Sequence, residues 1–528
     1  MSEFEFLKRQ HELGRISRRE FLGRAAAAGA GAALLGTMVA SVDAHAAATP
    51  RKGGSLRLGL GGGSTTDSLD PRVWTDSVMV VAGASHYNAL VEPAADRSST
   101  PELAESWEAK PGAAEWVFNL RKGVTFHNGK TFDADDAIYS INLHRGNTKS
   151  GAAGSFKEIA DVKKLGPNQI LVTLTSGDSE FPAILTDYHA KMVPNGFTDW
   201  AHAVGTGGYT VDHYDAGVRS TGKRFANYWK PDRANVDSFD ITVINDTSAR
   251  MNAMVSGQVD AINRVDPKTA GLIKRHPGVS LVVAPGGWHA VISMMQDRAP
   301  FQDVNLRLAM KYGVDRAQIV KTLFSGYGSV GNDHPISRAD KDYNNKLSQI
   351  AYDPDKTKFY LKKSGFSGPI LLDASDAAFN GAVDMCTLFQ ASAAKAGLKI
   401  DVKKDPADGF WDNVWLKNPC VTSYWAGRAT ATQMLDIAYG PTAPWNESHY
   451  KNPRFTQALT AAKMELDDAK RKQLVFECQA LLRDDGATVV PAFRDWIDAH
   501  SDKVGGHTPH SLFDMDNGYV VDKAWLKA

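Results

Sequence analysis

Strand-like and helix-like patterns alternate along this chain from Gly53 to the C-terminus, and no period repeats. Ser55 to Leu60 reads as a short strand, and alternating apolar residues in Glu115 to Phe126 and in Gln169 to Thr175 indicate half-buried strands. Helical patterns lie between and after these segments. The alternation of the two kinds of element predicts α/β domains with mixed sheets.

The predicted helices begin and end at recognisable residues. Asp133 precedes the run Ala134-Asp-Asp-Ala-Ile138, so an N-cap side chain and acids in the first turn start a helix there. Pro300 to Phe324 reads as two helices broken near Gly313, and Thr456 to Asp484 reads as a helical pair.

Length and charge limit the classes of function. The chain has 528 residues, 43% of them hydrophobic, which is enough for several domains of a globular protein. Its 60 basic and 60 acidic residues cancel. No basic excess remains to neutralise phosphates, so a nucleic-acid partner is not expected. The sequence also lacks C-x-x-C and Cys/His spacings typical of metal sites, so neither a metal nor a cofactor is expected.

The first 46 residues read as an export signal. Residues 17–23, Ser-Arg-Arg-Glu-Phe-Leu-Gly, resemble a twin-arginine motif, which is an address read by the export machinery. An Ala- and Gly-rich apolar run from Ala25 to about Val42 follows, and Ala44-His-Ala46 offers a peptidase site. We expect cleavage near Ala46 and a periplasmic protein, with a membrane anchor as the alternative.

Three cysteines in an oxidising compartment permit at most one internal disulfide. Cys478 lies at helical spacing from Leu474 and Leu481, the position of a small buried hydrophobic residue. Cys386 and Cys420 are candidates for a disulfide, but their spacing does not establish the geometry that the bond requires. The sequence leaves open whether Cys386 and Cys420 form a disulfide or stay free thiols.

Several separated segments resemble one family of proteins. The longest match is Pro101–Glu108, which continues into Trp116–Lys130 and Phe132–Asp136. The supporting segments are Leu69–Pro71, Gly205–Tyr209 with Asn227–Trp229, and Pro300–Asp303 through Arg307 to Val314–Arg316. Together they resemble family 5 of the ABC-transporter periplasmic solute-binding proteins, the class that binds peptides, dipeptides, opines and nickel.

The resemblance implies a fold and a mode of action. We expect a periplasmic-binding-protein-like fold with two lobes joined by two crossing strands, the first lobe carrying an extra subdomain. Lobe I would comprise about residues 47–90, 205–290 and 491–528, its subdomain about 91–204, and lobe II about 291–490. Crossings near Ala290 and Pro491 would form a hinge. Lobe closure over a solute would then present a monomeric protein to an ABC permease.

One segment departs from the family pattern. In peptide-binding members, a W-x-G-D segment lies against the ligand, and its Asp pairs with the amino terminus of the peptide. Here the corresponding residues are Trp425-Ala-Gly427-Arg428. An arginine cannot accept a hydrogen bond and stays positively charged, but its planar donors fit a carboxylate. We therefore expect Arg428 to hold an anionic group, helped by the Thr430 hydroxyl. In the alternative interpretation, Arg428 pairs with an internal carboxylate such as Asp436.

Aromatic residues near this segment and near the crossing complete the expected site. Trp288 and His289 follow Pro285-Gly-Gly287 at the crossing, Trp411 precedes the Arg428 segment, and the resemblance places Trp74 at the cleft from lobe I. Tryptophan supplies rigid apolar area with one donor, which suits a small organic ligand.

The predicted function is the capture of a small peptide-like or carboxylate-bearing solute for an ABC importer, without chemistry. The alternatives are a periplasmic enzyme or a ligand sensor that uses the same cleft. The sequence contains neither G-x-S-x-G nor H-E-x-x-H, which weakens the case for an enzyme.

Overall fold

The computed structural model describes residues 50–527. The predicted twin-arginine segment and its cleavage site near Ala46 lie outside the described residues. Within residues 50–527, no helix combines the length and the apolar character that crossing a bilayer requires.

The first large sheet has seven strands in the order β12-β20-β11-β1-β10-β9-β8. Its strands are β1 Ser55–Leu60, β8 Tyr209–Asp215, β9 Arg219–Arg224, β10 Ser238–Val243, β11 Ala261–Ile262, β12 Val279–Ala284 and β20 Trp496–Ser501. β1 runs parallel to β10 and β11, while the other pairs are antiparallel. The sheet is therefore mixed, as the sequence predicted.

Apolar alternation and burial explain the place of β1. Leu56, Leu58 and Leu60 are completely buried, so the period of two in the sequence directs them into the core. Helix α4 (Ser77–His86) contributes to the same core and is buried along its whole length. One short element, η1 (Pro71–Val73), lies near these core residues in the sequence. The other short elements lie near the C-terminus and are α18 (Asp514–Asn517), α19 (Val520–Lys523) and the strand pair β21 (Val504–Gly505) and β22 (Trp525–Leu526).

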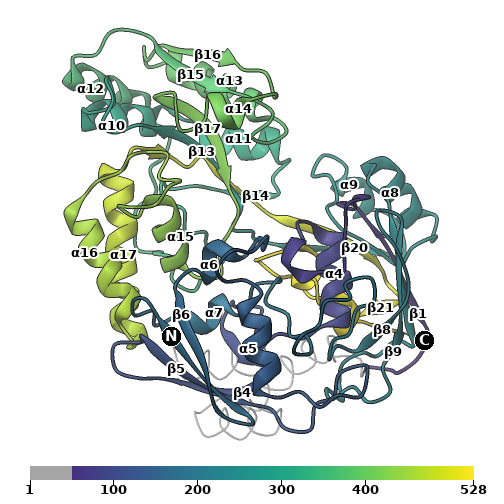
Figure 1. The fold of residues 1–528 in the computed structure, drawn as a ribbon. Coiled ribbons are helices and arrows are strands. Elements are labelled where there is room, and N and C mark those ends of the chain that lie inside the picture. The colour runs from purple at the N-terminus through teal and green to yellow at the C-terminus, as the bar shows by residue number, and fades with distance from the viewer. Residues whose placement is uncertain (1–49, 528) are drawn as a thin grey trace, which may run out of the picture. The chain divides into compact units, whose positions relative to one another are not determined.

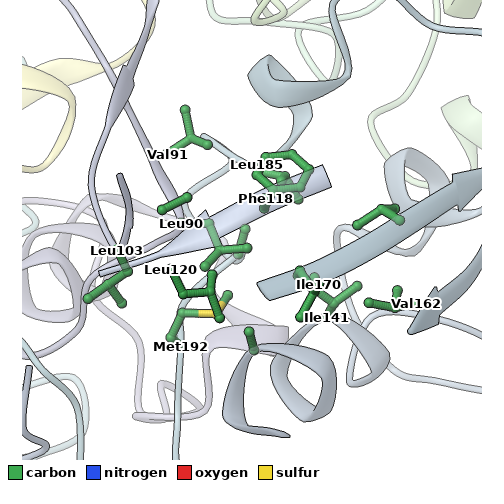
Figure 2. Packing of buried hydrophobic residues seen from close by; sticks show 14 of the residues in the cluster. Leu90, Val91, Leu103, Phe118, Leu120, Ile141, Val162, Ile170, Leu185 and Met192 are labelled. Carbon is green, nitrogen blue, oxygen red and sulfur yellow. The ribbon is translucent and has the colours of Figure 1, made fainter. Parts of the chain in front are cut away.

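A four-stranded antiparallel sheet, in the order β4-β5-β7-β6, forms a separate core (Figure 2). Its strands are β4 Ala104–Ala109, β5 Glu115–Leu120, β6 Ile159–Gly166 and β7 Gln169–Leu174, accompanied by the strand pair β2 Val91–Pro93 and β3 Ser99–Pro101. Figure 2 shows Ile170 beside Ile141, and Phe118 and Leu120 belong to the same buried cluster. Both strands form where alternation predicts them, but β5 ends at Leu120 and not at Phe126, and Val117 is buried as well.

The predicted helix start at Asp133 is also confirmed. The Asp133 carboxylate accepts hydrogen bonds from the backbone of Asp135 and Asp136, and the Asp136 carboxylate accepts one from the Asp133 backbone. This reciprocal capping box begins α5 (Ala134–Asn142). Two one-turn helices, α6 (Ala153–Phe156) and α7 (Phe181–Ile184), complete this region.

The second large sheet follows the order β14-β19-β13-β17-β15-β16, with β18 paired to β13. Its strands are β13 His289–Met294, β14 Gly328–Val330, β15 Ile370–Ala374, β16 Ile400–Lys404, β17 Cys420–Trp425, β18 Thr488–Val489 and β19 Ala492–Arg494. β15 runs parallel to β16 and β17, and β13 runs antiparallel to β17. This sheet is mixed too.

Helices accompany both large sheets, and the two predicted helical pairs are confirmed. α10 (Val304–Gly313) ends at the expected glycine, and Asp315 caps α11 (Arg316–Leu323). α16 (Pro453–Met464) and α17 (Asp468–Asp485) pack side by side (Figure 1). The remaining helices are α8 Thr247–Val255, α9 Ala270–Ile273, α12 Pro354–Ser364, α13 Ala382–Ala394, α14 Phe410–Asn413 and α15 Ala431–Tyr439.

Two short crossings connect the large sheets. The first is residues 285–288, between β12 and β13, and the second is Asp495, between β19 and β20. The backbone N–H of Arg494 donates to the carbonyl of Trp288 across 3.0 Å, so the crossings lie side by side. Gly286 is required there, because an added Cβ would lie 2.3 Å from the carbonyl oxygen of Arg494.

The crossings differ in one detail from the sequence prediction. Residues 492–494 were assigned to lobe I but are hydrogen bonded in the second sheet as β19. Backbone pairing with β13 and β14, which are distant in sequence, decides this membership. The other predicted lobe boundaries stay a prediction.

All three cysteines are buried free thiols. Cys386 and Cys420 both lie in the core of the second sheet, where the structure forms no disulfide between them. Burial raises the pKa of the Cys386 thiol to about 12, so it stays protonated and apolar in character. Cys478 packs beside Val475 and Leu482, which agrees with its expected place in a core.

Candidate functional site

The Arg428 loop connects the end of β17 to the start of α15. The Arg428 guanidinium donates to two carbonyls of its own loop, Ala426 at 2.9 Å and Gly427 at 3.2 Å. It also lies 5.7 Å from the centre of the Trp425 ring. Among residues 50–527, no carboxylate lies within ion-pair distance of it.

The structure contradicts the partner that the alternative interpretation named. Asp436 forms an ion pair with Lys463, at 2.8 Å, and not with Arg428. Burial lowers the pKa of Arg428, and Asp187, Tyr188 and Tyr424 only partly oppose this effect. A cation that has lost water without gaining a carboxylate is an attractive partner for an incoming anion.

Gly427 has a steric reason to be glycine. A Cβ added to Gly427 would lie 3.0 Å from the Cα of Gly287, and one added to Gly287 would lie 2.8 Å from the Cα of Gly427. The Arg428 loop therefore touches the first crossing. Gly427 acts through this close approach, because it has no side chain to offer a ligand.

Thr430 has a local task as well. Its hydroxyl accepts a hydrogen bond from the backbone of Gln433 at 3.2 Å and so caps α15. Thr430 and Arg428 also line a cavity of about 10 Å³, which is close to the room for one water molecule. A direct contact between the Thr430 hydroxyl and a solute stays a prediction.

Three aromatic side chains form a wall beside the first crossing. Trp288 stacks on Tyr424, with ring centres 5.8 Å apart and an interplanar angle of 21°. Trp411 meets the edge of Tyr424, with ring centres 6.1 Å apart. Tyr424 and Trp411 remain 39% and 38% exposed, so this wall offers accessible aromatic surface to a solute.

Glu447, which the sequence analysis missed, organises the neighbouring tryptophans. Its buried carboxylate accepts hydrogen bonds from Trp415 Nε1 at 2.7 Å, Trp425 Nε1 at 2.7 Å and Ser423 Oγ at 2.6 Å. Burial raises the pKa of Glu447, and these three hydrogen bonds oppose the rise. No sequence pattern indicates this role, because the donors lie more than twenty residues away.

Trp74 and His289, which are expected to line the cleft, are both buried. Trp74 is 1% exposed, donates to the carbonyl of Ser68, and leaves no room for a side chain at Gly83. His289 is completely buried, with Nδ1 3.0 Å from the carbonyl of Gly287, and burial lowers its pKa to about 4. A contact of either side chain with a solute stays a prediction.

Arg494 is a second guanidinium that the sequence analysis missed. It lies over the Trp288 ring at 4.7 Å and near the Trp496 ring at 5.7 Å. Burial and the nearby Arg264 lower the pKa of Arg494 to about 10. Arg494 lies beside the second crossing, so its contact with Trp288 extends the aromatic wall to that crossing.

Two mixed sheets joined by paired crossings, with accessible aromatic surface and two guanidiniums that lack a carboxylate partner among the described residues, are typical of a binding protein. Residues 99–445 match the bacterial extracellular solute-binding proteins, family 5 (Middle), and the chain belongs to that family. Such proteins are the periplasmic or extracellular solute-binding components of ABC importers and work with their permeases. The enzyme alternative is thereby wrong, because members bind solutes for transport.

Two relatives by sequence cover much of the chain. Glutathione-binding protein GsiB of Pectobacterium atrosepticum is 26% identical over 483 residues, which are 87% of this chain and 93% of that protein. Heme-binding protein A of Haemophilus influenzae is 29% identical over 369 residues, which are 61% of this chain and 66% of that protein.

Solved structures show the same fold. HbpA2 from Haemophilus parasuis superposes with a TM-score of 0.80 at 20% identity, covering 90% of this chain and all of that one (100%). AgaA from A. tumefaciens R10, in complex with agropinic acid, superposes with a TM-score of 0.73 at 23% identity, covering 90% of this chain and 99% of that one. The predicted two-lobed α/β fold is confirmed.

Proposed function

We propose that the protein captures a small organic solute by a carboxylate, or a similar oxygen-bearing anionic group, and delivers it to its ABC permease. The observation that carries the proposal is the Arg428 guanidinium, which has no carboxylate partner among residues 50–527. A guanidinium holds a carboxylate through two parallel hydrogen bonds. An incoming anion therefore supplies an interaction that the described part of the chain does not.

The aromatic wall supports an organic solute over an inorganic anion. Tyr424 and Trp411 keep accessible ring surface, while Glu447 fixes Trp425 and Trp415 beside them. Rigid aromatic faces bind apolar or planar groups at little conformational cost. The solute in this proposal has an anionic end at Arg428 and a less polar part on the wall.

Two comparisons support solutes of this kind. One relative is named a glutathione-binding protein, and one structural neighbour holds agropinic acid. Peptides with modified ends and opine-like amino-acid conjugates are thus the favoured classes. DppA from Helicobacter pylori, with a TM-score of 0.73 at 21% identity, is in complex with the peptide STSA, so the fold by itself accommodates a peptide as well.

The residue at position 428 separates these classes. A peptide amino terminus is a cation, and Arg428 repels it where an aspartate would attract it. Unmodified dipeptides and tripeptides should therefore bind weakly. Tight calorimetric binding of a library of plain peptides would contradict this expectation.

Export and closure complete the proposal. We infer that residues 1–46 direct export by the twin-arginine route, and that the mature protein is a monomer whose lobes close about residues 285–288 and Asp495. Replacing Arg18 and Arg19 together by lysine should retain the protein in the cytoplasm, which cell fractionation measures. Export of that variant at the normal level would contradict the assigned route.

Ligand identification and one substitution test the proposed site. Mass spectrometry of the solute that co-purifies with the mature protein should reveal a carboxylate-bearing organic molecule. Arg428→Ala should then weaken that solute at least about tenfold, because a charge-assisted hydrogen bond is worth about 1.5–3 kcal/mol. Isothermal titration calorimetry measures the change.

A matched substitution controls for the loss of charge. Arg275 is exposed and forms no ion pair with a described residue, so Arg275→Gln should leave the affinity unchanged. Full affinity in Arg428→Ala would assign the loop a purely structural role and overturn the proposed anion contact.

A further inference from the structure

The second crossing borders a cavity that no sequence pattern indicated. Its volume is about 280 Å³, close to the lower end of small-molecule sites. Arg494, Asp495 and Trp496 form one side, and Phe324 and Asn380 form another. Residues 264–268, which follow β11 of the first sheet, form a third side, so the cavity lies at the second crossing between this segment and the helical side of the second sheet.

The guanidinium of Arg494 enters this cavity with its donors free. It makes neither a hydrogen bond nor an ion pair with any residue in the range 50–527, and it lies near the rings of Trp288 and Trp496. Asp514 is near enough to raise the pKa of Arg494. However, Asp514 accepts from Ser77 Oγ, at 2.7 Å and 2.9 Å, and pairs with Arg264 at 2.7 Å.

Asp495 presents the opposite charge beside Arg494. Its Oδ1 atom is buried and has no hydrogen-bond partner among the described residues. Burial raises the pKa of Asp495, and Arg338 opposes the rise without reaching ion-pair distance. An acceptor that is buried without a donor costs free energy until a ligand supplies one.

The other charged groups of the cavity are engaged or exposed. Arg264 pairs with Asp76 and Asp514. Asp266 accepts a hydrogen bond from the backbone of Lys268 at 2.7 Å, and the Lys268 side chain is exposed. Asp384 is exposed on the first turn of α13. The charged lining groups that are neither engaged nor exposed are therefore the Arg494 guanidinium and the Asp495 carboxylate, which are adjacent in sequence.

We propose that Arg494 and Asp495 bind the α-amino-acid end of the solute, with its carboxylate on Arg494 and its ammonium group on Asp495. The inference rests on the proposed function and extends it to the second end of the same molecule. A guanidinium fork fits a carboxylate, and an ammonium group donates to a carboxylate oxygen. The carboxylate and the ammonium group of the solute are attached to the same carbon, and Arg494 and Asp495, which would bind them, are neighbours in the sequence.

The aromatic wall connects the two ends of this site. Trp288 lies between Arg494 and Tyr424, at 4.7 Å from the Arg494 guanidinium carbon and 5.8 Å from the Tyr424 ring centre. Tyr424 is also near enough to Arg428 to raise its pKa. In this proposal the solute runs along Tyr424 from one guanidinium toward the other. The substrate class is an amino acid whose side chain ends in a second carboxylate.

A pair of isomers tests this class with the exported full-length mature protein, freed of bound solute by dialysis. γ-Glutamylglycine carries an intact α-amino-acid end and a distant carboxylate. α-Glutamylglycine has the same composition and charge, but an amide replaces the carboxylate beside its ammonium group. Calorimetry should give at least about tenfold tighter binding of the γ-isomer, since one charge-assisted hydrogen bond distinguishes them.

Substitutions assign the preference to the crossing. Arg494→Gln and Asp495→Asn should each reduce the preference for the γ-isomer to less than about threefold, because each removes one charged contact and keeps a polar side chain. Arg275→Gln, an exposed change of the same charge, should keep the preference. Melting temperatures identify any variant that has lost its fold, and the isomer comparison in the unaltered protein stands without the variants.

The outcomes separate this inference from the proposed function. Equal affinity for the two isomers, binding of neither, or an unchanged preference in both crossing variants would overturn the inference. If a monocarboxylate binds through Arg428 without requiring Arg494, the proposed function stands and the inference fails. If the γ-isomer needs Arg494 and Asp495 but not Arg428, the inference stands and the anion contact at Arg428 fails.

Discussion

Buried arginines in two regions of the second lobe differ in whether a carboxylate pairs with them. Behind the sheet, Arg316 forms two hydrogen bonds with Asp333, at 2.7 Å and 2.8 Å, and donates to the carbonyls of Lys311 and Ile350. At the crossings, the acceptors that Arg428 reaches among residues 50–527 are carbonyls of its own loop. Arg494 reaches no described acceptor at all.

The difference teaches how to distinguish a structural charge from a binding charge. A guanidinium cannot lose its proton in a protein, so burial without an anion has no remedy inside the chain. Arg316 has its anion. Arg428 and Arg494 lack theirs among the described residues, and both border cavities. The predictions below test whether this contrast separates stability from binding.

The largest expected effect is on the structural arginine. Arg316→Ala leaves the buried Asp333 without its cation and should lower the free energy of unfolding by about 3–5 kcal/mol. Chemical denaturation measures the loss. Arg428→Ala is the matched control and should change stability by less than about 0.5 kcal/mol, because no buried carboxylate loses its partner. Similar losses in both variants would remove the contrast.

The expected loss of stability at Glu447 is intermediate, because its partners are neutral donors. Glu447→Ala leaves two indole N–H groups and one hydroxyl without an acceptor. The free energy of unfolding should fall by about 1–3 kcal/mol, and tryptophan emission should change with the altered surroundings of Trp415 and Trp425.

A conservative substitution separates charge from geometry at this position. Glu447→Gln keeps one acceptor oxygen and should retain most of the stability and most of the solute affinity. An alanine variant with unaltered emission and affinity would show that Glu447 does not position the aromatic wall.

A buried histidine differs from a buried arginine, because it can lose its proton and become neutral. Both ring nitrogens of His334 lack hydrogen-bond partners among the described residues, and burial lowers its pKa to about 3. Below pH 6.5 the unfolded chain takes up a proton that the folded chain refuses. The free energy of unfolding should therefore decrease as the pH is lowered, by about 2 kcal/mol for this group between pH 6.5 and pH 5.

A substitution assigns this pH dependence to His334. His334→Leu should flatten part of the decline, measured as unfolding free energies at pH 7.5 and pH 5. The other buried histidines, such as His289, keep their share of the slope. An unchanged slope in the variant would contradict the assignment.

The smallest expected effect is at Thr430. Thr430→Ala removes the cap of α15 and should cost about 1 kcal/mol of stability. Thr430→Ser keeps a capping hydroxyl and serves as the control. A loss of solute affinity in the alanine variant that the serine variant restores would add the hydroxyl to the site. Unchanged affinity would leave Thr430 with capping alone.

Much of the local structure was predictable because its causes lie within a few residues. The alternation of Leu56, Leu58 and Leu60 predicts β1, and the acids after Asp133 predict the start of α5. Gly313 ends α10 where the sequence pattern breaks. The change at Arg428 was visible for the same reason, since it interrupts a short local motif.

The rest of the site depended on contacts that no short stretch of sequence encodes. The sequence by itself determined the α/β class, the family resemblance and the presence of an arginine at position 428. Only the tertiary structure decided that Trp74 and His289 are buried, that Glu447 collects distant tryptophan donors, and that Arg494 and Asp495 keep unsatisfied atoms. The physical reason is that a polar group's partners are set by where distant segments pack. Periodicity and capping are set by neighbours along the chain.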